Sequence, residues 1–134
     1  PYLQAIKDTC LLSFRSDSNS LVKEASLELL LHVIENFNHI EIEGIVKPKD
    51  LMSMLLDEIK LRRPSASVKG IIWNLVGVLH EKYGLGEFRV ESQDVMFIQL
   101  MEQMKSEKPE IKCIVGILKG FVHSLTSECT LDED

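Results

Sequence analysis

Aromatic residues, cysteine and long apolar runs are all scarce in this chain of 134 residues. Only 6% of the residues are aromatic although 45% are hydrophobic, so the core must be built from Leu, Ile and Val, which suits helices packed on helices better than a β-sandwich. No apolar run reaches the roughly 20 residues that a membrane-spanning helix needs, and no basic-then-apolar leader suggests secretion. The chain begins with Pro1 rather than Met, so we expect it to be a piece of a longer protein.

Cysteine and histidine are too few and too scattered to indicate a metal site. Cys10, Cys113 and Cys129 are odd in number and share no CxxC spacing, so buried or idle thiols in a reducing compartment are favoured over a redox or metal role. The four histidines do not combine with cysteines at zinc-ligand spacing. Of these, His80 and His123 fall near predicted helix ends, where a cation is favourable. We therefore expect no metal, no cofactor and no small-molecule ligand.

One apolar pattern occurs three times along the chain. The offsets of 46 residues from Val22 to Val68 and of 43 residues from Val68 to Ile111 fall in the range of two-helix solenoid repeats. The predicted fold is therefore all-α, an α-solenoid of three antiparallel helix pairs with about six helices. We place the pairs at residues 1–38, 48–84 and 92–126 of one domain, 1–134, with an acidic tail at 127–134. The aligned positions are Val22, Val68 and Ile111; Lys23, Lys69 and Lys112; Leu29, Leu75 and Leu118; and Val33, Leu79 and Val122.

Cap and breaker residues predict the helix ends. Pro48 suits the start of a helix, Ser65 or Ser67 can cap the next one, and Ser92 can cap the fifth. Gly84 is suited to the position just after a helix, and the polar residues from 126 onward are expected to fray. The helices are thus expected at about 2–15, 21–38, 48–61, 66–83, 92–105 and 109–125, with a loop at 39–47.

Several apolar and small residues are best explained by packing. Gly77 and Gly120 occupy one repeat position inside their helices, where each costs about 1 kcal/mol relative to Ala, so we predict that two helices approach closely there. Trp73 is interpreted as a core residue of the middle copy. A core role is also favoured over an adaptable binding surface for the five methionines, which are Met52, Met54, Met96, Met101 and Met104.

The residues also resemble a known family. Asp17 followed by Val22-Lys23-Glu24-Ala25 and a run of leucines is similar to the second helix of HEAT repeats. Over the whole chain, in register, the sequence resembles the amino-terminal HEAT region of the DNA-dependent protein kinase catalytic subunit, in the PI3-kinase-related kinase family. The resemblance is carried by Pro1-Tyr2, Ile6-Lys7, Thr9-Cys10, residues 25–30, Leu118-Lys119-Gly120 and the acidic tail.

This resemblance implies a nuclear scaffold segment that helps to seat double-stranded DNA ends and the Ku heterodimer in non-homologous end joining. The kinase of that family lies at the far carboxyl end. The chain itself has no HRD or DFG sequence, and Gly84-Leu85-Gly86 lacks the third glycine of a phosphate loop. We therefore expect no catalytic residues and no enzyme activity in this segment, although the parent protein is expected to be a serine/threonine kinase.

One concentrated basic spot is the candidate contact with DNA or a partner. It comprises Lys60, Arg62 and Arg63, with Lys69 beyond them. A helix-pair array has one edge formed by the turns within pairs and an opposite edge formed by the loops between pairs. Residues near the within-pair turns have a small excess of cations. Residues near the opposite edge, which include Glu91, have a large excess of acids. The favoured explanation of the spot is that cations complement a helix dipole. The functional explanation is a sequence-independent contact with backbone phosphates.

Two alternatives to a DNA-contacting scaffold remain at this stage. In the first, the repeats are structural spacers that touch no partner. In the second, the chain is an unrelated HEAT adaptor for protein ligands. Both stay open because repeat type alone determines no partner. The net charge of −6 argues against uniform attraction to nucleic acid or to an anionic membrane. Any DNA contact is therefore expected to be local and to act within the full-length protein.

Overall fold

The computed structural model describes residues 4–9, 20–36, 47–62 and 64–132, with side chains of the last helix described as far as residue 126. These residues form helices and short connections and contain no strand. Residues 39–46 of the loop predicted at 39–47 and the ends of the first predicted helix lie outside the described residues, and residues 4–9 are helical. The other elements are α2 (Ser20–Asn36), α4 (Pro48–Asp57), the π-helix η1 (Glu58–Arg62), α5 (Ala66–Tyr83), the 3-10 helix η2 (Gly86–Phe88), α6 (Arg89–Lys105) and α7 (Ile111–Asp132).

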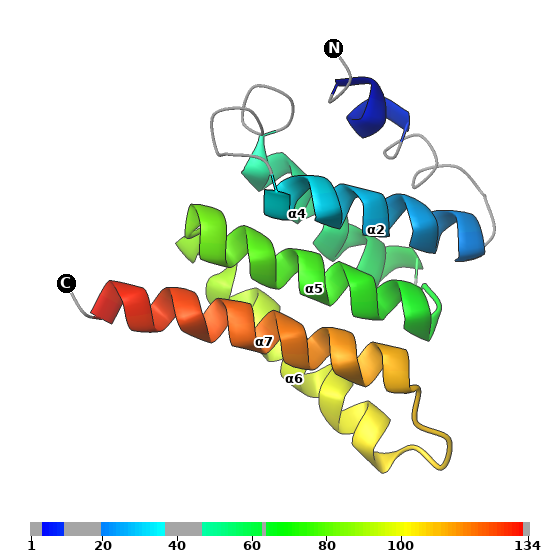
Figure 1. The fold of residues 1–134 in the computed structure, drawn as a ribbon. Coiled ribbons are helices and arrows are strands. Elements are labelled where there is room, and N and C mark those ends of the chain that lie inside the picture. Colours follow the sequence, from blue (N-terminus) through cyan, green and yellow to red (C-terminus); the bar gives the residue numbers. More distant parts are fainter. Residues whose placement is uncertain (1–3, 10–19, 37–46, 63, 133–134) are drawn as a thin grey trace.

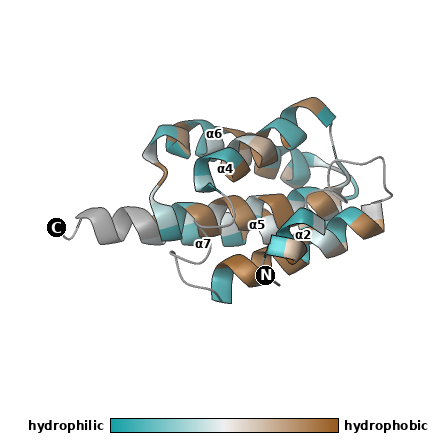
Figure 2. Ribbon diagram, turned by 90° about the horizontal axis from the view of Figure 1, so that it is seen from above, coloured by the Kyte–Doolittle hydropathy of each residue, from teal (hydrophilic) through white to brown (hydrophobic). Residues whose placement is uncertain are grey.

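The helices form two layers, which confirms the predicted all-α fold of antiparallel helix pairs. Helices α2, α5 and α7 lie side by side in one layer (Figure 1), while α4 and α6 form the second layer (Figure 2). α4 with η1 pairs with α5, and α6 pairs with α7. The turns within these two pairs lie at the same edge of the molecule (Figure 1), as expected for an array in which each pair repeats the direction of the one before it.

The ends of α4 and α5 agree with the cap signals. Pro48 is in the first turn of α4. The Ser65 hydroxyl accepts a hydrogen bond from the backbone N–H of Val68 at 3.4 Å, and Gly84 ends α5 in the left-handed conformation with φ 58°. One feature of this pair was not predicted, because residues 58–62 continue α4 as a π-helix rather than as α-helix.

The predicted ends of α6 and α7 were partly wrong. α6 begins at Arg89 rather than at Ser92, and Ser92 is fully buried instead of capping. Its hydroxyl donates to the carbonyl of Arg89 at 3.1 Å and lies 2.8 Å from Nε2 of the buried His80. α7 begins at Ile111 and continues to Asp132, beyond the expected end at 125, because residues 126–132 contain neither Pro nor Gly to stop a helix.

Trp73 is a core residue, as predicted. Its side chain is fully buried, and its indole N–H donates to Oε1 of Gln99 on α6 at 2.8 Å. A buried indole N–H needs such an acceptor because its desolvation is otherwise uncompensated. The side chain therefore joins the second helix pair to the third. Trp73 belongs to one hydrophobic core whose buried members also include Leu55, Ile72, Leu75, Val76, Leu79, Met96 and Ile117.

The predicted close approach of Gly77 and Gly120 is confirmed, and it is part of a longer contact. A Cβ added to Gly77 would lie 2.5 Å from the carbonyl oxygen of Gly120. A Cβ added to Gly116 would lie 2.0 Å from the carbonyl oxygen of Gly70. α5 and α7 therefore run in backbone contact over two glycine pairs, a packing that small residues permit because no side chain separates the helices.

The repeat positions differ in burial between the three copies. In α5, Val68 is 1% exposed and Leu75 is fully buried, whereas Ile111 and Leu118 at the same positions of α7 are 74% and 48% exposed. In α2, Val22 and Leu29 are also exposed. The methionines divide in the same way, since Met52 and Met96 are buried but Met101 and Met104 are exposed. The prediction of a core role was therefore wrong for the last two.

Cys113 lies at the glycine contact and is fully buried. Burial raises the pKa of its thiol above the ordinary value of 9.0, an effect that the nearby charge of Lys69 partly offsets. Because the folded pKa is raised, the thiol contributes stability that is fully present below pH 9 and is lost as the pH rises through the folded pKa. In a Cys10→Ser, Cys129→Ser variant, we expect a thiol reagent to modify Cys113 only on global unfolding and the free energy of unfolding to fall as the pH rises above 9. Rapid modification of the native protein would contradict this burial.

Candidate nucleic-acid interface

Three of the basic residues singled out from the sequence are placed by the structure, Lys60 and Arg62 in η1 and Lys69 in the first turn of α5. The π-helix of residues 58–62 leads into the turn between η1 and α5, and the Ser65 cap then starts α5. Lone π-helical turns are rare and often occur at functional sites. The turn lies at the edge where the within-pair turns of the array are found (Figure 1).

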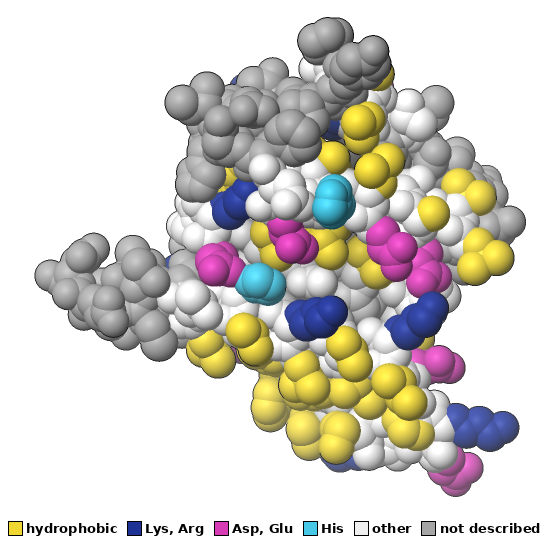
Figure 3. All heavy atoms as spheres, in the orientation of Figure 1, with side chains coloured by type: hydrophobic (Ala, Val, Ile, Leu, Met, Phe, Trp, Pro, Cys, Tyr) yellow, Lys and Arg dark blue, Asp and Glu magenta, His cyan; other side chains and the backbone are white. Residues whose placement is uncertain are grey.

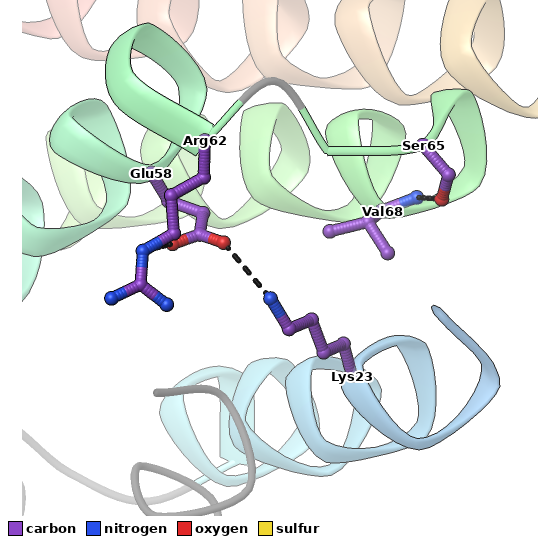
Figure 4. A network of polar contacts seen from close by, with 5 residues as sticks. All are labelled: Lys23, Glu58, Arg62, Ser65 and Val68. Atoms are coloured by element: carbon purple, nitrogen blue, oxygen red, sulfur yellow. Dashed lines mark hydrogen bonds and ion pairs between the residues drawn. The ribbon is translucent and has the colours of Figure 1, made fainter. Parts of the chain in front are cut away.

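Glu58 is a buried acid in the centre of this segment. Its side chain is 5% exposed, and its two carboxylate oxygens lie 3.2 Å from Nζ of Lys23 and 3.6 Å from Nε of Arg62 (Figure 4). A carboxylate that is removed from water needs such cations, because its desolvation otherwise costs several kcal/mol. The Lys23–Glu58 pair thus links α2 to the second helix pair. Arg62 contributes to the same network through its Nε atom.

Lys60 also has an acidic partner. Its ammonium group forms an ion pair with Glu91 in the first turn of α6, and the two side chains are 41% and 46% exposed. The count of charges in the sequence places Glu91 near the loops between helix pairs, and Glu91 does follow the connection from α5 to α6. What the count does not show is that Lys60 lies close enough to pair with it. α6 starts three residues earlier than predicted, and its first turn comes within reach of η1.

The structure does not bring the four predicted cations into one cluster. Arg63 lies outside the described residues, and Lys69 is half-buried in the first turn of α5, where its charge acts on the thiol of Cys113. Lys60 and Arg62 are the two that present substantial charged surface, with side chains 41% and 50% exposed. A phosphate at this edge would have to share them with Glu91 and Glu58.

The carboxylate partners of the repeated lysines could not be predicted from the sequence. Lys23 pairs with Glu58, and Lys112 pairs with Glu24 of α2 at 3.2 Å, so two of the three lysines at one repeat position hold neighbouring elements together. Their common register was visible in the sequence. The partners were not, because Lys23 and Glu58 are 35 residues apart and Lys112 and Glu24 are 88 residues apart. Two of the three aligned lysines, Lys23 and Lys112, therefore have acidic partners within the chain.

Among residues that the structure describes, no three His, Cys, Asp or Glu side chains are grouped so that they could hold a metal ion. No helix within those residues is both long enough and apolar enough to cross a membrane. A shallow groove crosses α2, α5 and α7, but the charged side chains along it are of both signs, Glu24 and Glu28 facing Lys112 and Lys119, which gives no preference for one class of ligand.

Comparison with known proteins identifies the family. A family model described as DNA-PKcs, N-terminal, matches residues 1–134. The chain belongs to this family. No curated protein and no solved structure gives a significant match. The chain is therefore similar along its whole length to the amino-terminal region of DNA-PKcs, and this membership sets aside the alternative of an unrelated HEAT adaptor.

Proposed function

We propose that this segment of DNA-PKcs is a non-catalytic scaffold that helps to form the arm engaging DNA ends and the Ku heterodimer in non-homologous end joining, in the nucleus. The observation that carries the proposal is the family match along the whole chain. Within it, the chain is one array of three helix pairs at residues 1–38, 48–84 and 92–126. Its contribution is to hold in place the edge formed by the turns within pairs, which we call the turn edge, because stacked pairs rigidify the turns that connect their helices.

The turn edge supplies the contact with DNA in this proposal. Lys60 and its partner Glu91 both keep nearly half of their side-chain surface exposed, and exposed ion pairs contribute only about 0–1 kcal/mol. A backbone phosphate can therefore replace Glu91 as the acidic partner of Lys60 at small cost, whereas Arg62 is expected to keep its contact with the buried Glu58. Such a contact reads no base and weakens as salt rises, because binding releases counterions from the DNA.

Reversing two charges at this edge tests the contact. In the full-length protein, Arg62→Glu combined with Arg63→Glu is expected to weaken binding to a DNA end several-fold at low salt. Each lost phosphate contact should flatten the plot of log affinity against log salt by about 0.9. Binding would be measured with and without Ku over a salt series.

The matched control is Lys47→Glu combined with Lys49→Glu. This variant makes the same change in net charge at exposed positions at the start of α4, away from the turn. Equal weakening by both variants would indicate a general charge effect and contradict a local contact. An unchanged slope of log affinity against log salt for the Arg62, Arg63 variant would also contradict a local contact. Urea denaturation of both variants checks that folding is intact.

A structural spacer without a direct partner is the second candidate, and the ion pairs favour it. Arg62 and Lys60 each have a carboxylate partner within the chain, so the basic residues are already used in stabilising the turn. On this view the Arg62, Arg63 variant lowers the free energy of unfolding slightly and leaves DNA binding unchanged. The salt series therefore separates the two functions directly.

A further inference from the structure

The connection between η1 and α5 contains a serine that follows two arginines. Residues 62–65 read Arg62-Arg63-Pro64-Ser65, so the arginines stand three and two positions before the serine. One class of serine/threonine kinases recognises this spacing, because each guanidinium can form paired hydrogen bonds with a carboxylate in the kinase's substrate groove. Between Glu58 and Glu81 the sequence contains no acidic residue, so nothing in this stretch repels such a groove.

Ser65 is accessible in the folded chain. It is an exposed residue with extended backbone angles, φ −60° and ψ 160°, directly before the first residue of α5. Its hydroxyl oxygen accepts a hydrogen bond from the backbone N–H of Val68 at 3.4 Å, a contact that uses one of the two lone pairs of the oxygen. The neighbouring Leu61 is 79% exposed. The outer side of this connection is therefore open to a large partner such as a kinase.

The arginine three positions before Ser65 can be approached from solvent. Arg62 contacts the buried Glu58 through its Nε atom, and its side chain is 50% exposed. Figure 4 shows the two terminal nitrogens of Arg62 directed away from Glu58. Paired hydrogen bonds to a carboxylate can form along that edge of the guanidinium, so a kinase can recognise Arg62 without breaking the network around Glu58.

A kinase binds its target residues in an extended form, and this connection needs little rearrangement to reach one. Pro64 and Ser65 are already outside the helices. Arg62 is the last residue of a π-helix, a type that rarely exceeds one turn, and the first N–H groups of a helix have no carbonyl partner within it. Fraying one turn on each side therefore costs less than opening the middle of a helix.

We propose that Ser65 is a phosphorylation site for a serine/threonine kinase that recognises arginine three and two positions before its target. The Ser65 oxygen attacks the γ-phosphorus of ATP bound to that kinase, the bond from this phosphorus to the β–γ bridging oxygen breaks, and ADP leaves. The hydroxyl proton passes to a carboxylate base of the kinase. The product carries a phosphate of about −1.5 to −2 charges at pH 7 at the N-cap position of α5.

The phosphate acts on the start of α5. The first turn of this helix contains no acidic residue but does contain Lys69, whose charge is opposed by the positive end of the helix dipole. A phosphate at the N-cap position accepts hydrogen bonds from the backbone N–H groups of this turn and offsets its positive potential. Phosphorylation is therefore expected to stabilise the first turn of α5.

A second consequence rests on the proposed contact between the turn edge and DNA. The new negative charge lies close in sequence to Lys60 and Arg62, the two cations that present substantial charged surface there. It repels DNA phosphates and competes with them for these cations. Phosphorylation of Ser65 is therefore expected to weaken binding of the full-length protein to a DNA end several-fold at low salt.

Phosphorylation of the full-length protein tests the proposal. The catalytic subunit of cyclic AMP-dependent protein kinase, which recognises this arginine spacing, would be added with ATP, and mass spectrometry would locate the phosphate within residues 64–69. Ser65 should be modified, whereas the half-buried Ser67 should not. Arg62→Lys combined with Arg63→Lys keeps the charge but loses the paired hydrogen bonds, and should slow the reaction at least about 10-fold. An unmodified Ser65, or an unchanged rate in the lysine variant, would overturn the proposal.

Hydrogen exchange measures the effect on α5 independently of DNA. Amide exchange in residues 66–69 is expected to slow by about two- to five-fold on phosphorylation. The matched control is Ser65→Asn, which keeps a capping side chain but offers no hydroxyl, so kinase and ATP should leave its exchange unchanged. Equal or faster exchange in the phosphorylated protein would overturn the effect on α5. If the Arg62, Arg63 charge reversal leaves DNA binding unchanged, only the proposed DNA contact fails, because the phosphorylation and exchange results do not involve DNA.

Discussion

Gly116→Ala is expected to destabilise the protein by at least about 2 kcal/mol, although alanine is the better helix former by about 1 kcal/mol. The added Cβ would lie 2.0 Å from the carbonyl oxygen and 2.3 Å from the Cα of Gly70. Both atoms belong to backbone that cannot rotate away, so α5 and α7 must separate. Overpacking of this kind usually costs about 1–3 kcal/mol and sometimes more, and the separation also loosens the buried side chains around Cys113.

The measurement is urea denaturation followed by circular dichroism, and Gly86→Ala is the control. Gly86 has no atom within 4 Å of an added Cβ, so its substitution should change the free energy of unfolding by less than about 0.5 kcal/mol. The double variant Gly70→Ala, Gly116→Ala should cost less than the sum of the single changes, because one separation of the helices relieves both clashes. Wild-type stability of Gly116→Ala would show that the two backbones do not meet.

The glycine contact illustrates what the sequence could predict about the fold. Gly77 and Gly120 stand at equivalent repeat positions, so their role in close packing followed from the repeat alone. Gly70 and Gly116 do not stand at equivalent positions, and no pattern within one helix identifies their pairing. The offset between facing residues depends on how far α7 slides along α5, which is decided by the packing of the whole layer.

Ser92 and His80 show the limit of cap signals. A serine before an apolar stretch is a good N-cap residue because its hydroxyl can accept from a free backbone N–H, and the signal is entirely local. In the structure Ser92 is inside α6 and its hydroxyl lies 2.8 Å from the ring of His80, a residue of the preceding helix. Burial of that hydroxyl was decided by a partner 12 residues away. The start of α6 was misplaced for this reason.

The candidate interface was predictable in position but not in its electrostatics. A count of charges locates Lys60 and Arg62 near a turn, yet the availability of those charges depends on distant acids. Glu91 reaches Lys60, and the buried Glu58 holds both Arg62 and Lys23. The π-helical turn, which redirects the side chains of residues 58–62, has no clear signature in the sequence. Because these acids partly neutralise the cations, the positive charge available to a partner is smaller than the count of basic residues indicates.

Trp73→Ala is expected to cost about 3–5 kcal/mol, the range for removing a large aromatic side chain from a core. This is a large share of the roughly 5–15 kcal/mol by which domains are stable. Trp73 is fully buried and contacts Gln99 across the second and third helix pairs, so the substitution leaves a cavity and removes a hydrogen bond between the pairs. The free energy of unfolding would be measured by circular dichroism, since the variant lacks the chain's single tryptophan.

Trp73→Phe separates the two contributions. It keeps most of the apolar volume and loses the indole N–H, and the half-buried Gln99 can turn its amide toward water, so we expect a smaller loss of about 1–2 kcal/mol. Gln99→Ala instead leaves the buried N–H without its acceptor and should cost at least as much, whereas the double variant should cost less than the sum of the two. If Trp73 were a ligand-binding residue rather than a packing residue, Trp73→Phe would impair binding with little change in stability. A core role instead predicts a loss of stability, because the indole is fully buried and presents no surface to a partner.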